Sequence, residues 1–200
     1  MITISRPLFT LSDRQYLPSE QLEGPTVRVT RILTAIVLGL AMIAPISARS
    51  QDLEAVTAAE DALIAAWDQT PITFRKAFFA TEAKSFGLYA ERGNSTFKTG
   101  EPLLVYTEPV GYAWRENADG TFTFGFDVDL KLSSANGEVL AEQENFQRVE
   151  LNSHARNREF MLSLTLDLTG ADPGDYVIEY RTRDIASDKM GTISLPFTIE

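Results

Sequence analysis

The chain has 200 residues, of which 44% are hydrophobic and 23% charged, as in soluble globular proteins with one domain of ordinary size. Its formal net charge of −10 argues against nucleic acid as a partner, because nucleic-acid binders carry clustered Lys and Arg. The absence of cysteine excludes disulfides, thiolate metal sites, cysteine nucleophiles and the lipid anchor of a bacterial lipoprotein, and a single histidine makes a histidine-built zinc site hard to assemble.

Residues 1–26 show neither helical nor strand periodicity and mix Pro, Ser, Gln and charged residues. We interpret them as a non-native upstream extension or a disordered leader. In the first case translation starts at Val27, from a valine codon that can initiate in bacteria.

Residues 27–50 have the three parts of a secretory signal peptide. Arg28 and Arg31 form a basic start, an apolar run follows, and small residues allow cleavage after Ala48 or Ser50. The run of Ile32 to Ile43 is shorter than the roughly 20 residues that cross a bilayer. We therefore expect a soluble periplasmic or secreted bacterial protein without a stable membrane span; the alternative is a buried helix or a signal anchor.

Residues 51–70 are predicted to form one amphipathic helix that lies on the domain and covers an edge or a seam. Its apolar residues fall near one face, and Pro71 stops it. That face consists of Leu53, Val56, Leu63, Ile64 and Trp67.

Residues 71–200 change to an apolar period of two, which predicts strands. Clear alternation occupies 122–132, 160–168 and 192–199, and Asn136-Gly137 indicates a reversal. Weaker strands are expected at about 72–80, 86–91, 102–109, 139–151 and 175–184. Some seven or eight strands without an intervening helix predict an all-β, antiparallel sandwich or barrel.

Tyr176 follows the turn at Pro173-Gly174 and opens a strand. In immunoglobulin-like (Ig-like) sandwiches, a tyrosine at this place hydrogen-bonds back across a corner between the two sheets. We therefore predict a structural role for Tyr176. The segment "DPGDYVIEYRTRDIASDKMGTISLPFTI" also resembles the last two strands of Ig-like or fibronectin-III-like domains in exported bacterial proteins, most of them uncharacterised. This resemblance implies a fold and a compartment but no activity, and the Cys pair of antibody domains is missing.

No catalytic or cofactor motif is present: neither a nucleophile elbow, nor a phosphate loop, nor a zinc-protease motif, nor a calcium loop. Asp127 and Asp129 share one strand face and could hold a cation, but simple solvation of that face is the stronger expectation. His154, the one base available to a serine hydrolase, falls in a polar loop. We predict no catalytic residues, no cofactor and no metal.

The loops 110–120, 152–158 and 185–190 should share one end of the sandwich, because successive connections alternate between its ends. Aromatic residues beside arginines are typical of recognition surfaces, and this end should be locally basic. The candidate partner-binding residues are Tyr112, Trp114, Arg115, His154, Arg156 and Arg158. In the alternative, Tyr112 and Trp114 belong to the core and the arginines pair with Glu116 and Glu159.

Together these patterns predict a non-enzymatic envelope or secreted module that binds a protein or a glycan through its loop end. One alternative is a protein that acts on a small molecule or polysaccharide through a carboxylate site between sheet and helix. Another is a structural subunit that donates or accepts an edge strand.

Overall fold

A computed structural model of the protein describes residues 3–5 and 48–200. The chain divides into two units, Met1–Pro7 with Ala58–Glu200, and Leu8–Thr57, and the site described below belongs to the first. Residues 6–47, which hold most of the predicted leader and signal peptide, lie outside the described residues. No helix among the described residues is long and apolar enough to cross a membrane.

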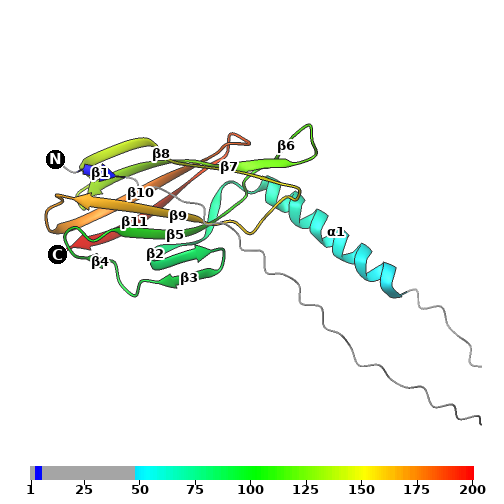
Figure 1. The fold of residues 1–200 in the computed structure, drawn as a ribbon, viewed down its shortest axis with the longest axis horizontal. Coiled ribbons are helices and arrows are strands. Elements are labelled where there is room, and N and C mark those ends of the chain that lie inside the picture. The colour runs from blue at the N-terminus through cyan, green and yellow to red at the C-terminus, as the bar shows by residue number, and fades with distance from the viewer. Residues whose placement is uncertain (1–2, 6–47) are drawn as a thin grey trace, which may run out of the picture. The chain divides into compact units, whose positions relative to one another are not determined.

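The protein is mostly strand with one helix, which confirms the all-β prediction (Figure 1). The first sheet has the order β1-β9-β5-β2-β3, and all its neighbouring strands are antiparallel. Its strands are β1 (Thr3–Ser5), β2 (Thr73–Ser85), β3 (Leu88–Glu91), β5 (Leu103–Val110) and β9 (Leu162–Thr169).

The second sheet has the order β4-β11-β10-β7-β6, and β8 also pairs with β7. Its pairs are antiparallel except β4 with β11, which run parallel. Its strands are β4 (Thr96–Phe97), β6 (Arg115–Glu116), β7 (Phe122–Ser134), β8 (Val139–Ser153), β10 (Gly174–Asp184) and β11 (Met190–Ile199). The structure therefore has more strands than the seven or eight expected; the additional ones, β1, β4 and β6, have only two or three residues.

Alternating side chains of both sheets meet in one hydrophobic core. Leu103 and Leu164 from the first sheet, and Phe126 and Ile178 from the second, are all fully buried. Phe79 of β2 contacts the rings of Phe97 and Phe197 in the other sheet, with centroids 5.0 and 6.1 Å apart. The period-two pattern thus buries one face of β9, β10 and β11, as the hydrophobic effect requires.

Tyr176 lies near the start of β10, after the turn from β9. Its hydroxyl donates a hydrogen bond to the backbone carbonyl of Asp172 at 2.6 Å, and its ring stacks on Phe197 with centroids 5.5 Å apart. The side chain therefore links the β9–β10 turn to the core.

The helix α1 (Ala48–Gln69) begins three residues before the predicted start. Only its end is packed: Trp67 is buried, whereas Leu63 is 47% exposed and Ile64 is half-buried. The expectation that α1 lies along the domain is therefore wrong for this part of the helix.

Candidate functional site

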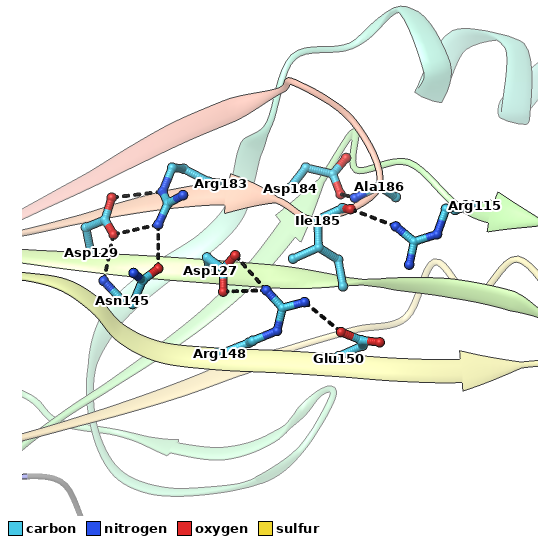
Figure 2. A network of polar contacts seen from close by, with 10 residues as sticks. All are labelled: Arg115, Asp127, Asp129, Asn145, Arg148, Glu150, Arg183, Asp184, Ile185 and Ala186. Carbon is cyan, nitrogen blue, oxygen red and sulfur yellow. Dashed lines mark hydrogen bonds and ion pairs between the residues drawn. The ribbon is translucent and has the colours of Figure 1, made fainter.

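The three loops singled out in the sequence meet at one end of the sheets, as predicted. Their contacts are direct: Ala113 N–H donates to the Asp184 carboxylate at 2.8 Å, and the Tyr112 hydroxyl donates to the Asn157 carbonyl at 2.7 Å. Figure 2 includes a third contact, in which the Arg115 guanidinium donates to the Ile185 carbonyl at 3.1 Å. We call these three loops, with the adjoining end of α1, the loop end.

The C-terminus of α1 is fixed to the loop end by two side chains. The Trp67 indole N–H donates to the Tyr112 carbonyl at 2.7 Å. The Lys189 ammonium donates to the carbonyls of Asp68, Thr70 and Gly111 at 2.6, 2.9 and 2.8 Å. A cation at this position also interacts favourably with the negative end of the helix dipole.

Tyr112 is a core residue and not a recognition residue, which corrects the first of the predicted partner-binding positions. Its side chain has no exposed surface, and its ring contacts Trp67, Phe124, Phe126 and Phe160 with centroids 5.2 to 6.1 Å apart. Burial raises the pKa of its hydroxyl well above the usual range. A partner at the loop end could not reach this side chain.

Trp114 is half-buried beside Tyr112. Its ring stacks on Trp67 with centroids 5.6 Å apart, and its indole N–H donates to the Asn157 carbonyl at 3.0 Å. Trp114 therefore supports the loop end with one face of its ring and remains partly accessible.

The basic residues of the loop end do not pair with Glu116 and Glu159 as the sequence suggested. Arg156 is exposed, and its guanidinium lies over the ring of Phe122, 5.2 Å from the centroid. Arg158 lies 3.9 Å from Glu60 of α1, a distance at which an ion pair is weak. Arg115 and His154 are both exposed.

An open cavity of about 920 Å³ separates α1 from the segment 154–159. Its walls are Glu60, Asp61 and Ile64 of α1, Phe122 of β7, and residues 154–159. We call it the helix–loop groove. Its charges are mixed, with two arginines and three carboxylates, so the prediction of a locally basic end does not describe this groove.

Asp127 and Asp129 on β7 are ion-paired rather than merely solvated (Figure 2). Arg148 of β8 binds both oxygens of Asp127 at 2.9 and 2.8 Å and also contacts Glu150. Arg181 and Arg183 of β10 both donate to Asp129, which is 8% exposed.

The environment of Asp129 determines its protonation. Burial acts to raise the pKa, but hydrogen bonds from Arg183, the N–H of Asn145 and Arg181 outweigh burial and lower the pKa to about 2. Asn145 has a positive φ of 51° within an irregularity of the β7–β8 pairing, which turns its N–H toward the carboxylate. Asp129 is therefore ionised at neutral pH and cannot act as a general acid there.

Arg181 and Arg183 were not among the residues predicted from the sequence, although the sequence contains a signal for them. The two arginines stand two residues apart in "YRTRD", so they share one strand face, as do Asp127 and Asp129. A second cavity of about 420 Å³ lies beside these pairs, with Asp129, Lys131, Glu142 and Glu179 among its lining residues. Four of its charged lining residues are paired with one another, since Asp129 binds Arg181 and Lys131 binds Glu179.

Within residues 3–5 and 48–200, no group of three His, Asp or Glu side chains is placed so that it could hold one metal ion. No protein-family model matches the chain, and no curated protein sequence matches it.

Proposed function

We propose that the protein is an exported, non-enzymatic module of the bacterial envelope or exterior that binds a partner in the helix–loop groove. The observation that carries this proposal is the groove itself: an open cavity whose walls come from different elements and combine the half-buried Ile64 and Phe122 with charged side chains. Such a combination of apolar and charged lining residues is typical of recognition sites. The mixed charges favour a protein segment over an anionic glycan.

The strand order supports an Ig-like sandwich as the scaffold of this module. β2, β5 and β9 occupy the places of strands A, B and E, while β7, β8, β10 and β11 occupy those of C, C′, F and G. The hydrogen bond from Tyr176 back to Asp172 corresponds to the tyrosine corner of that fold. In such sandwiches the loops at one end commonly bind the partner.

Export is supported by the sequence of residues 27–50, with its basic start, apolar run and small residues before Ser50. The lack of cysteine is compatible with the envelope because the core needs no disulfides. The acidic charge makes nucleic acid an unsuitable partner.

A rigid frame favours binding, since less conformational freedom is lost when the partner arrives. Here Trp67 and Lys189 hold the end of α1, while Tyr112 and Trp114 share the Asn157 carbonyl as acceptor. One wall of the groove is thus tied to the core at several points.

The test is chemical cross-linking and capture from the host envelope, with mass spectrometry of the cross-linked peptides. The variant Arg156→Ala/Arg158→Ala removes two basic residues of the groove and leaves the core untouched. The variant Lys84→Ala/Lys98→Ala removes the same charge at exposed positions elsewhere and is the matched control.

We expect one partner that cross-links to segment 154–159 or to α1 in the wild type and the control, and whose yield falls at least about tenfold in the groove variant. A partner retained equally by all three proteins would place binding elsewhere. Absence of any partner from the wild type would contradict the proposal.

A carbohydrate-active function is the second candidate, because the groove also contains the carboxylates Glu60, Asp61 and Glu159. Two carboxyl groups about 5–10 Å apart suffice for glycoside hydrolysis. Incubation with envelope polysaccharides, followed by analysis of reducing ends, would reveal such activity. Activity that disappears in Glu60→Gln or Asp61→Asn would favour this candidate over the binding module.

A further inference from the structure

The long strands at the edges of the two sheets differ in how they are protected against pairing with other chains. β8 carries four charged residues, Glu142, Glu144, Arg148 and Glu150, and its pairing with β7 is irregular around Asn145. Charges and bulges are the devices by which natural sheets prevent edge-to-edge association. The β8 edge is therefore protected.

β9 has neither device. Its sequence LSLTLDLT holds one charged residue, Asp167, and its pairing with β5 is regular from Leu162 to Leu166. Among the described residues, the side of β9 away from β5 meets one element, β1, which pairs with residues 167–169. Residues 162–166 extend this edge beyond the three residues that β1 covers.

β1 shows that the β9 edge accepts a strand. It pairs antiparallel, with Thr3 opposite Thr169, Ile4 opposite Leu168 and Ser5 opposite Asp167. β1 is linked to β9 only through a long stretch of chain, so its place is available to any segment that offers the same backbone pairing.

We propose that the outer edge of β9 is a strand-acceptor site that binds an extended segment of a partner protein in antiparallel register, a role that β1 fills within this chain. The backbone ladder supplies affinity, and alternate side chains supply selectivity. Residues opposite each other share one face of a sheet, so the bound segment needs apolar residues opposite Leu164, Leu166 and Leu168, which are buried, and small polar residues between them.

The occupant is a different protein rather than a second copy, because two chains of formal charge −10 repel each other. If the signal peptide is cleaved after Ala48 or Ser50, β1 is removed and the edge opens. This step rests on the export in the proposed function; the acceptor site itself does not.

The test uses the full-length chain and a fluorescent, capped peptide, Thr-Ile-Ser-Val-Thr-Val-Lys, which continues the register of β1 toward Leu162. Alternate residues of a strand point their backbone N–H at the same neighbour, so the N–H of either Thr3 or Ile4 faces β9. The double substitution Thr3→Pro/Ile4→Pro removes that N–H in either case. The same peptide, N-methylated at its first three residues, tests the backbone ladder. Circular dichroism checks the fold, and Thr3→Gly/Ile4→Gly replaces the proline variant if that variant unfolds.

We expect saturable binding that is at least about tenfold tighter for the β1 variant than for the wild type, where β1 competes, and that N-methylation abolishes. Arg156→Ala/Arg158→Ala should leave this binding unchanged, which separates the edge from the groove. Equal binding of the N-methylated peptide, or no binding to the variant, would overturn the proposal. Dimerisation of the variant without peptide binding, measured by analytical ultracentrifugation, would overturn it in favour of a second copy.

Discussion

Arg183 binds both carboxylate oxygens of Asp129, with its Nε 3.0 Å from Oδ2 and its Nη2 2.9 Å from Oδ1. Bidentate arginine–carboxylate pairs are the stronger kind of ion pair because two charge-assisted hydrogen bonds form in parallel. Arg181 adds two more hydrogen bonds to Oδ2. Asp129 thus joins β7 to β10 on the face of the sheet opposite the core.

Asp129→Asn should lower the free energy of unfolding at pH 7 by about 1–3 kcal/mol, because it removes charge-assisted hydrogen bonds from a buried position. The pKa of Asp129 is about 2 in the folded protein against an ordinary value of 3.8. Its contribution is therefore complete above about pH 5 and is lost progressively as the pH falls through 2. Urea unfolding at pH 7, 4 and 2.5 should show the gap between wild type and variant narrowing with acid.

Asp127→Asn is the matched control for this experiment. The partner of Asp127, Arg148, has a side chain that is 53% exposed, so the loss should stay below about 1 kcal/mol. Equal losses in the two variants, or a gap that does not change with pH, would contradict the special role of Asp129.

The sequence predicted much of the fold because alternation is a local signal. The pattern in 122–132 identified β7 and its buried face, and Pro173-Gly174 with Tyr176 placed a corner before β10. Features that depend on strand partners could not be read in the same way. Asp129 is buried because β10 places two arginines over it, and nothing within β7 shows which strand lies beside it.

The candidate site was predictable in place but not in composition. The order of the strands indicated that the loops would meet, yet whether an aromatic loop residue turns inward depends on distant partners. Tyr112 is buried because Trp67, 45 residues earlier, contacts it from the end of α1. A site between sheet and helix was foreseen only as an alternative, and its second wall was missed, because nothing in the helical pattern of α1 shows that the segment 154–159 lies opposite it.

Gly111→Ala should destabilise the loop end far more than Gly120→Ala. Both glycines have a positive φ, 88° and 78°, so alanine is strained at each by about 1–2 kcal/mol. At Gly111 an added Cβ would also lie 2.5 Å from the Pro71 carbonyl oxygen, whereas at Gly120 it meets no described atom within 4 Å. We expect an additional loss of at least about 2 kcal/mol for Gly111→Ala in thermal or urea unfolding. Similar losses would mean that the chain between α1 and β2 moves aside at little cost.

Lys189→Met should loosen the end of α1. Methionine has about the length of the apolar part of lysine but cannot make the three hydrogen bonds to backbone carbonyls. The free energy of unfolding should therefore fall by about 2–3 kcal/mol. Tryptophan fluorescence, which comes from Trp67 and from Trp114 stacked on it, should shift to the red as their surroundings admit water. Lys84→Met, at a side chain that is 68% exposed, should change stability by no more than about 0.5 kcal/mol. An unchanged fluorescence spectrum would show that Trp67 alone holds the helix end.

Two tyrosines of β10 should respond in opposite directions to the loss of a hydroxyl. Tyr176→Phe removes the hydrogen bond to the Asp172 carbonyl and should cost about 1 kcal/mol. Tyr180 is fully buried, and its hydroxyl has no hydrogen-bond partner among the described residues. Because an unsatisfied buried hydroxyl is unfavourable, Tyr180→Phe should raise stability by about 1 kcal/mol or more. Urea unfolding of the two variants measures both effects under the same conditions. A loss of stability in Tyr180→Phe would show that a buried water satisfies this hydroxyl. An unchanged stability of Tyr176→Phe would show that the ring packing of Tyr176, and not its hydrogen bond, stabilises the corner.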